Sequence, residues 1–255
     1  MRLFALAALA AMWGLQVSAA VPAENVLHVY GPGGPLPAMR DAATAFGRMH
    51  GVTVKVTAGP TPQWIDQARL NGDVIYSGSE VMMSDFIAAM PEIDAGSVRP
   101  LYLRSAAILV RPGNPAAITG INDLLKSSHH ILVVNGAGQQ GLWEDVAGRL
   151  GQIQSVRAFR SNITVVAKNS AEARKAWISD KSLDAWLIWT IWQDANPTLA
   201  DQVAIEPRYA IYRDTGVALT KRGEKRLMAK QFADFLASPR GAAIFAKWGW
   251  MAPSS

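Results

Sequence analysis

The sequence predicts an α/β protein built as two lobes that are joined by two crossover segments. Three observations carry this prediction: short apolar runs alternate with helical patterns, the alternation returns in the second half of the chain, and two long extended runs separate the halves. Such alternation indicates a largely parallel sheet that helices cover on both faces. A chain of 255 residues, 50% of them hydrophobic, is ample for such a core.

The first lobe begins with a buried strand at Val26–Tyr30, which ends in the turn Gly31–Pro35. Apolar residues then recur at helical spacing from Met39 to Met49, and Gly51 ends this helix. The same signals predict strands at Val52–Thr57 and Asp73–Ser77, with helices over Trp64–Leu70 and from Gly78–Glu80 onward.

Two extended runs, Leu101–Pro112 and Tyr209–Leu219, are predicted to cross between the lobes. We therefore expect residues 21–104 and 213–255 in the first lobe and residues 105–212 in the second. The second lobe and the chain end are predicted to contain strands near Ile131–Asn135, Ile163–Ala167 and Asp184–Trp189, and helices near Gly141–Leu150, Ala171–Ile178, Glu224–Leu236 and Pro239–Trp248.

Residues 1–20 predict a cleaved signal peptide and hence export to the periplasm. They carry one positive charge at Arg2, an apolar middle that is too short to span a bilayer, and the small residues Ser18-Ala19-Ala20. The chain has no Cys, which excludes a lipid-anchored cysteine and a disulfide framework. Its net charge of +5 suits a small anionic ligand. The sequence has no basic run interleaved with aromatic residues, so nothing in it indicates nucleic-acid binding.

The turn Gly136–Gly141 fits the G-x-G-x-x-G spacing of dinucleotide-binding turns. Such a site needs a carboxylate at the end of the next strand, but that strand ends in Val166–Asn169. Lys168 would suit a 2′-phosphate, yet an exported protein does not normally meet soluble nicotinamide cofactors. We therefore predict no cofactor, and instead an anion-binding turn with Gly141 and the specificity-setting amides Gln139 and Gln140.

Other strand-to-helix turns offer further contacts to an anion. Gly33 and Gly34 directly precede a helix and predict a nest of backbone N–H groups, although an ordinary turn would also contain glycine. Ser77 and Ser79 offer hydroxyl groups, but Ser79 is equally suited to cap a helix. Ser170, in a similar capping sequence, is a further candidate contact.

The end of the third second-lobe strand and the return crossover supply the remaining candidates. Trp189 and Thr190 are placed to line a cleft between the lobes. Arg213 is the best single cation, because a guanidinium binds an oxyanion in bidentate fashion. The alternative for Arg213 is an ion pair with Asp214, and the alternative for Asp145 is stabilisation of a helix dipole.

The chemistry-bearing residues do not assemble into a catalytic set. A G-x-S-x-G elbow is absent, and the histidines lack metal-ligand spacing to one another or to a carboxylate. We therefore predict a protein that is not an enzyme and holds no metal, with an exported enzyme as the least favoured alternative.

Several ordered segments resemble the AcfC/PEB3-like family of class II periplasmic solute-binding proteins, which is akin to the molybdate- and sulfate-binding group. The segments that carry the resemblance are Tyr30–Pro35, Gly138–Asp145, Asp184–Trp186, Tyr212–Gly216 and Lys247–Trp250. The resemblance covers nearly all of the chain after the signal peptide.

This resemblance implies a two-lobe "Venus flytrap" that captures a small oxyanion or organic anion, such as a phosphorylated acid or a polycarboxylate. It implies ligand contacts at Gly33, Gly34, Ser77, Ser79, Gly141 and Arg213. It also implies an ABC transporter component or a chemoreceptor as partner, and a homodimer. The alternative that it leaves open is a surface adhesin or colonization factor with a vestigial cleft.

Overall fold

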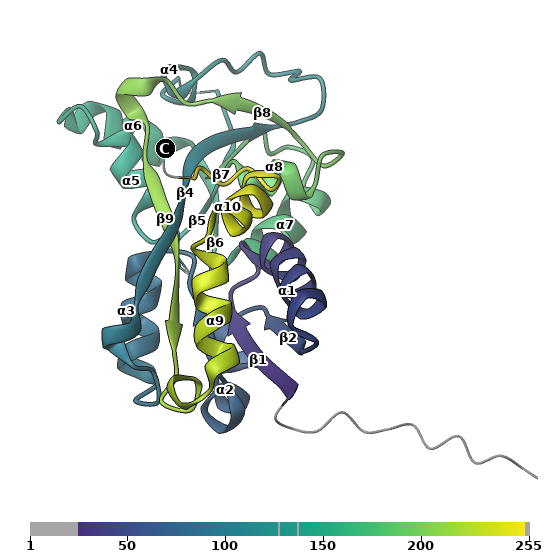
Figure 1. Cartoon of the computed structure of the whole chain (residues 1–255). Coiled ribbons are helices and arrows are strands. Elements are labelled where there is room, and N and C mark those ends of the chain that lie inside the picture. Colours follow the sequence, from purple (N-terminus) through teal and green to yellow (C-terminus); the bar gives the residue numbers. More distant parts are fainter. Residues whose placement is uncertain (1–24, 127, 137, 253–255) are drawn as a thin grey trace, which may run out of the picture.

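The computed structural model describes residues 25–126, 128–136 and 138–252, so the predicted signal peptide lies outside the described residues. Strands and helices alternate as predicted (Figure 1). The strands are β1 (Val26–Gly31), β2 (Thr53–Ala58), β3 (Val74–Tyr76), β4 (Arg99–Val110), β5 (Ile131–Val134), β6 (Ile163–Ala167), β7 (Ala185–Trp189), β8 (Asp201–Ala204) and β9 (Tyr212–Leu219). The α-helices are α1 (Leu36–His50), α2 (Ile65–Asn71), α3 (Glu80–Ala89), α4 (Ile121–Leu124), α5 (Leu142–Ala147), α6 (Ile153–Asn162), α7 (Ser170–Ser179), α8 (Ile191–Ala195), α9 (Leu227–Leu236) and α10 (Pro239–Ala246).

The first lobe is a sheet with helices on both faces. β1 pairs in parallel with β2 and with β3, as the strand–helix order predicts. On one face, Phe46 of α1 contacts Phe232 and Phe235 of α9. On the other face, Trp64 packs edge-on against Phe86 of α3. Because β1, β2 and β3 run parallel, the turns that follow them all lie at one edge of this sheet.

The second lobe repeats this arrangement around β5, which pairs in parallel with β6 and β7. The end of β4 joins as an antiparallel strand, since Ala106–Val110 pair with β7 and Ala107–Val110 also pair with β8. Trp177 of α7 and Trp186 of β7 are fully buried against each other. The carboxyl ends of β5, β6 and β7 therefore form an edge like that of the first lobe.

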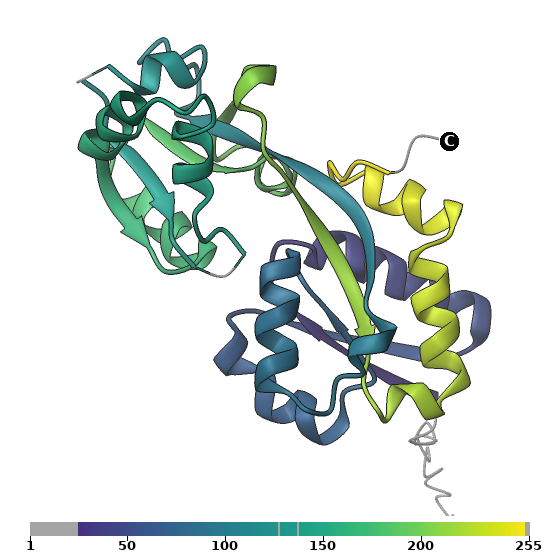
Figure 2. The ribbon, with the colours of Figure 1, turned by 90° about the vertical axis from the view of Figure 1, so that its left-hand side faces the viewer.

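β4 and β9 cross between the lobes, which confirms the predicted two-lobe α/β architecture with two crossover segments (Figure 2). The first half of β4, Arg99–Ser105, pairs with β9, and β9 continues into the first lobe as the antiparallel neighbour of β3. The expected lobe boundaries, 104/105 and 212/213, fall within these two strands and stay predictions.

Some elements differ from the sequence predictions. The helix expected over Glu224–Leu236 is a 3-10 turn followed by α9, because Gly223 packs closely against the Asp73 backbone before the helix begins. The last helix ends at Ala246 and not at Trp248, since the chain leaves it to pair with β4. α6 was not predicted because Phe159 is its one large buried apolar residue. None of the helices within the described ranges is long and apolar enough to cross a membrane.

Candidate functional site

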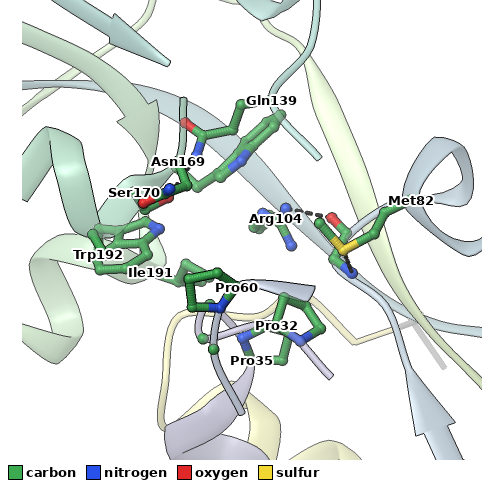
Figure 3. A pocket seen from close by; sticks show the side chains of 16 residues that line it. Pro32, Pro35, Pro60, Met82, Arg104, Gln139, Asn169, Ser170, Ile191 and Trp192 are labelled. Atoms are coloured by element: carbon green, nitrogen blue, oxygen red, sulfur yellow. Dashed lines mark hydrogen bonds between the residues drawn. The ribbon is translucent and has the colours of Figure 1, made fainter. Parts of the chain in front are cut away.

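A cavity of about 120 Å³ lies between the two lobes, beside β4 (Figure 3). The turns after β1, β2 and β3 form one wall, and residues that follow β5, β6 and β7 form the other. Ligands of open α/β sheets bind at such carboxyl ends of strands. The volume is several times the roughly 30 Å³ that one water occupies in the liquid, so it can hold a small molecule. The described residues that line it include no carboxylate.

The N-terminus of α1 forms part of the first-lobe wall. Gly33 and Gly34 line the cavity, and the N-cap position, Pro35, makes no side-chain capping hydrogen bond. The first turn of a helix carries a partial positive charge, which favours an anion. A Cβ on Gly34 would lie 3.6 Å from Cδ1 of Ile191, a residue of the opposite wall. The two lobes therefore approach each other closely at this turn.

Arg104 of β4 is the cation of the cavity, and its side chain is almost fully buried. Its guanidinium donates to the carbonyl oxygens of Gly78 and, at 3.4 Å, Asp214. Among the described residues no carboxylate forms an ion pair with it, and its Nε has no hydrogen-bond partner. Burial lowers the pKa of Arg104 to about 9, and the charges of Asp214 and Arg213 act in opposite directions on it. The group is still a cation at neutral pH.

Two indole rings flank this guanidinium. Cζ of Arg104 lies 4.6 Å from the ring centroid of Trp189 and 4.8 Å from that of Trp250. Both distances are within the range of cation–π attraction. Nε1 of Trp189 is buried without a hydrogen-bond partner among the described residues. The rings hold the cation in place without neutralising its charge.

The second-lobe wall carries the polar side chains of the cavity. The Gln139 amide donates to Oγ of Ser170 at 2.7 Å, and its Oε1 is buried without a described partner. Asn169 caps α7 by accepting from the backbone N–H of Glu172 at 2.9 Å. The arrangement therefore offers one cation, a helix N-terminus and amide or hydroxyl groups, and this is chemistry for binding a small anion.

Comparison with known proteins also indicates a protein that binds a small solute. Residues 27–251 match the family model of the bacterial extracellular solute-binding protein. The chain belongs to this family. None of the curated proteins searched matches it.

This solute-binding protein is also similar to solved structures of PEB3. A PEB3 with bound L-phospholactate is 34% identical, with a TM-score of 0.81 over 88% of this chain and 99% of that chain. Peb3 from Campylobacter jejuni is 33% identical, with a TM-score of 0.80 over the same shares. The periplasmic molybdate-binding protein of Azotobacter vinelandii shares the fold at 19% identity, with a TM-score of 0.67 over 89% of this chain and 100% of that one. The chain is thus a PEB3-like binding protein with the class II two-lobe fold.

The structure brings together five of the residues that the sequence nominates as ligand contacts. Those that line the cavity of this binding protein are Gly33, Gly34, Gln139, Ser170 and Trp189. They come from four separate turns or strand ends in the sequence analysis, and the α/β topology gathers them at one place.

Two serines that were nominated do not line the cavity. Ser77 is fully buried, and its Oγ accepts from the backbone N–H of Gly216 at 3.3 Å. Ser79 caps α3 by accepting from the N–H of Met82 at 3.2 Å, which is the alternative that its position suggested. Both hydroxyls stabilise the turn on which Gly78 presents its carbonyl to Arg104.

Gln140, Gly141 and Thr190 also lie outside the lining. Gly141 occupies the position before α5 with φ of 72°, a left-handed conformation that favours glycine. Thr190 donates its backbone N–H to Ser105 at 3.0 Å and leads into α8. For Gly141 and Thr190 the structure shows backbone roles.

Arg213 does not line the cavity and instead forms an ion pair with Asp145 of α5. The ion-pair alternative predicted for Arg213 is therefore corrected, because its partner is Asp145 and not Asp214. Asp145 also lies in the first turn of α5, where the helix dipole favours a negative charge. Asp214 accepts from the backbone N–H of Glu80 at 3.0 Å. Burial, with the charge of Asp214 nearby, raises the pKa of Glu80. Asp214 thus contacts Glu80 within the first lobe, while Arg213 contacts Asp145 of the second lobe.

Sequence reasoning missed Arg104. The available signal was a cation in the middle of the apolar extended run Leu101–Pro112, whose other cation, Arg111, lies at its end. A charge is rarely placed inside a buried strand without a partner.

Proposed function

We propose that this protein captures a small anionic solute in the cavity between its lobes, with Arg104 as the main cation. The observation that carries the proposal is the buried guanidinium of Arg104, which has carbonyl and aromatic neighbours but no described carboxylate in ion-pair contact. An unpaired buried charge costs several kcal/mol, on the order of the desolvation penalty of one ion. An anion that enters the cavity would offset this penalty.

The rest of the lining supports a negatively charged ligand. The α1 N-terminus at Gly33 and Gly34 favours an anion, and the lining has no carboxylate to repel one. Gln139, Ser170 and Trp189 supply polar groups on the opposite wall. The PEB3 structure with bound L-phospholactate, at 34% identity, supports a carboxylate or phosphate as the recognised group.

Calorimetry with L-phospholactate, phosphoglycerate, citrate, sulfate and molybdate tests the proposal. We expect the wild-type protein to bind at least one of these anions with a 1:1 stoichiometry. Folded protein that binds none of them would contradict an anion-binding function.

Two arginines of the same strand provide a matched pair of variants. Arg104→Gln removes the charge in the cavity, while Arg99→Gln removes a half-exposed charge that pairs with Asp234 at 3.0 Å on the protein surface. We expect Arg104→Gln to weaken binding by about a hundredfold or more and Arg99→Gln to retain it. Equal loss in both variants would mean that general electrostatic attraction, not the cavity, accounts for binding.

We further propose that the protein is exported to the periplasm and delivers its anion to an ABC transporter component or a chemoreceptor. The family of extracellular solute-binding proteins supports this role. N-terminal sequencing of the periplasmic fraction is expected to find a mature chain that begins at Val21. Retention of Met1 in the cytoplasm would contradict export. The homodimer that the resemblance implies stays a prediction, which light scattering can test.

A further inference from the structure

The segment Lys247–Met251, here named the C-terminal clamp, leaves α10 and lies against the crossing strand β4 (Figure 2). Met251 donates its N–H to Leu103 at 2.7 Å and accepts from the Leu103 N–H at 3.1 Å. Trp248 donates from Nε1 to a carboxylate oxygen of Asp41 on α1 at 2.9 Å. The clamp thus joins α1, the helix that begins at the cavity, to the strand that carries Arg104.

The clamp also touches the second lobe. Gly249 has φ of 77°, and a Cβ at this position would overlap the Asp194 carboxylate and lie 3.7 Å from Cα of Ile191. Both of these residues belong to α8, and Ile191 lines the cavity. Only a residue without a side chain fits between the clamp and α8. The clamp is therefore a place, besides β4 and β9, where the lobes are held together.

Trp250 is the part of the clamp that contacts the cation. Its side chain is buried, and its ring packs edge-on against Phe245 with a centroid distance of 6.0 Å. It also lies beside the guanidinium of Arg104, and Trp250 is not among the residues that line the cavity. Any effect of Trp250 on a ligand must therefore pass through Arg104 or through the lobe contact.

We propose that Trp250 is a positioning residue that keeps the guanidinium of Arg104 oriented for binding an anion. This inference rests on the proposed function. Trp189 covers one side of the guanidinium, but Trp189 moves with the second lobe because it ends β7. Trp250 is fixed to β4 through Met251, the next residue. When the lobes separate, Trp250 stays beside Arg104 and keeps the cation ordered, so that less side-chain entropy is lost on binding.

The test compares Trp250→Phe, Trp250→Leu and Trp248→Leu with the wild-type protein. Phenylalanine keeps an aromatic face for the guanidinium, leucine keeps apolar volume without one, and Trp248→Leu removes a tryptophan of the same clamp that does not contact Arg104. Calorimetry with L-phospholactate, citrate and sulfate gives the affinity, and its stoichiometry reports the folded fraction separately. Thermal unfolding shows how much each variant loses in stability.

We expect Trp250→Leu to weaken anion binding roughly tenfold, as the loss of a desolvated cation–π contact implies. Trp250→Phe should bind within about threefold of wild type, and Trp248→Leu should bind as wild type does. Full affinity in Trp250→Leu, or an equal loss in Trp248→Leu, would overturn the positioning role while leaving the proposed function intact. A folded wild-type protein that binds none of these three anions, and neither phosphoglycerate nor molybdate, overturns both.

Discussion

Arg104 and Arg213 lie opposite each other in the paired crossing strands, yet their surroundings differ completely. Arg104 is buried beside two indole rings and donates only to carbonyl oxygens among the described residues. The Arg213 side chain is about one-third exposed (31%) and is neutralised by Asp145. One cation is thus available to an anion from outside the chain, and the other already has an anion from within it.

Both residues are arginines, so this difference shows that the groups facing a guanidinium decide whether it can bind an external anion. The same guanidinium group is a lobe contact where a carboxylate faces it, and we propose it as a ligand contact where none does. Strand pairing places both groups at the junction of the lobes, so their divergent environments come from the elements packed around each one.

The largest expected effect is on affinity. Arg104→Gln should weaken anion binding about a hundredfold or more, roughly 3 kcal/mol, since it removes charge-assisted hydrogen bonds. Arg213→Gln should change affinity by no more than about threefold, because the solvated ion pair of Arg213 contributes little. Calorimetry on both variants measures the difference. A larger loss in Arg213→Gln would reverse the roles assigned to the two residues.

The next effect concerns closure of the lobes. Gly249→Ala should weaken binding about tenfold, because alanine is strained at a left-handed φ and its methyl displaces Asp194. X-ray scattering should show a smaller ligand-induced decrease in the radius of gyration than in wild type. Gly113→Ala provides the control, since Gly113 has a similar φ of 78° and nothing nearby for a Cβ to meet. Equal losses of affinity in both variants would mean that backbone strain, and not the overlap with Asp194, causes the effect.

A smaller effect is expected on stability without ligand. Arg104→Met should raise the free energy of unfolding by about 1 kcal/mol, because replacing an unpaired buried charge with an apolar side chain removes its desolvation penalty. Urea unfolding of the anion-free protein measures this. Destabilisation of several kcal/mol would instead indicate that the hydrogen bonds to Gly78 and Asp214 repay the penalty.

The smallest expected effect is at the ion pair. Asp145→Asn should reduce the free energy of unfolding by no more than about 0.5 kcal/mol, as is typical of solvated pairs. The effect should shrink further at high salt, because exposed charges are screened. Thermal unfolding at low and high salt checks this, and a loss that does not depend on salt would indicate a packing role for Asp145.

Most of the fold could be predicted because burial is periodic in the sequence. β6 has the predicted bounds, and α1 ends at Gly51, whose φ of 67° is the left-handed cap that glycine favours. The short or weakly amphipathic elements could not be predicted in this way, because β8 spans four mostly exposed residues and α6 buries little apolar surface. Such elements form because of tertiary contacts that local patterning does not encode.

The candidate site could be predicted as a place but not as a set of side chains. Strand-to-helix turns pointed to Gly33, Gly34 and Ser170, which line the cavity. The choice between Arg104 and Arg213 could not be made, because it depends on Asp145 approaching β9 from the other lobe. The sequence indicates Trp250 only as part of a segment that resembles the family. Its contact with Arg104 joins residues that are far apart in the chain, so no local pattern predicts it.

A structure of the protein with the anion that it binds most tightly tests the central claim directly. The account predicts an oxyanion of the ligand within hydrogen-bond distance of the Arg104 guanidinium, with the Arg213–Asp145 pair intact. An anion bound to Arg213, with Asp145 displaced and Arg104 out of contact, would contradict it.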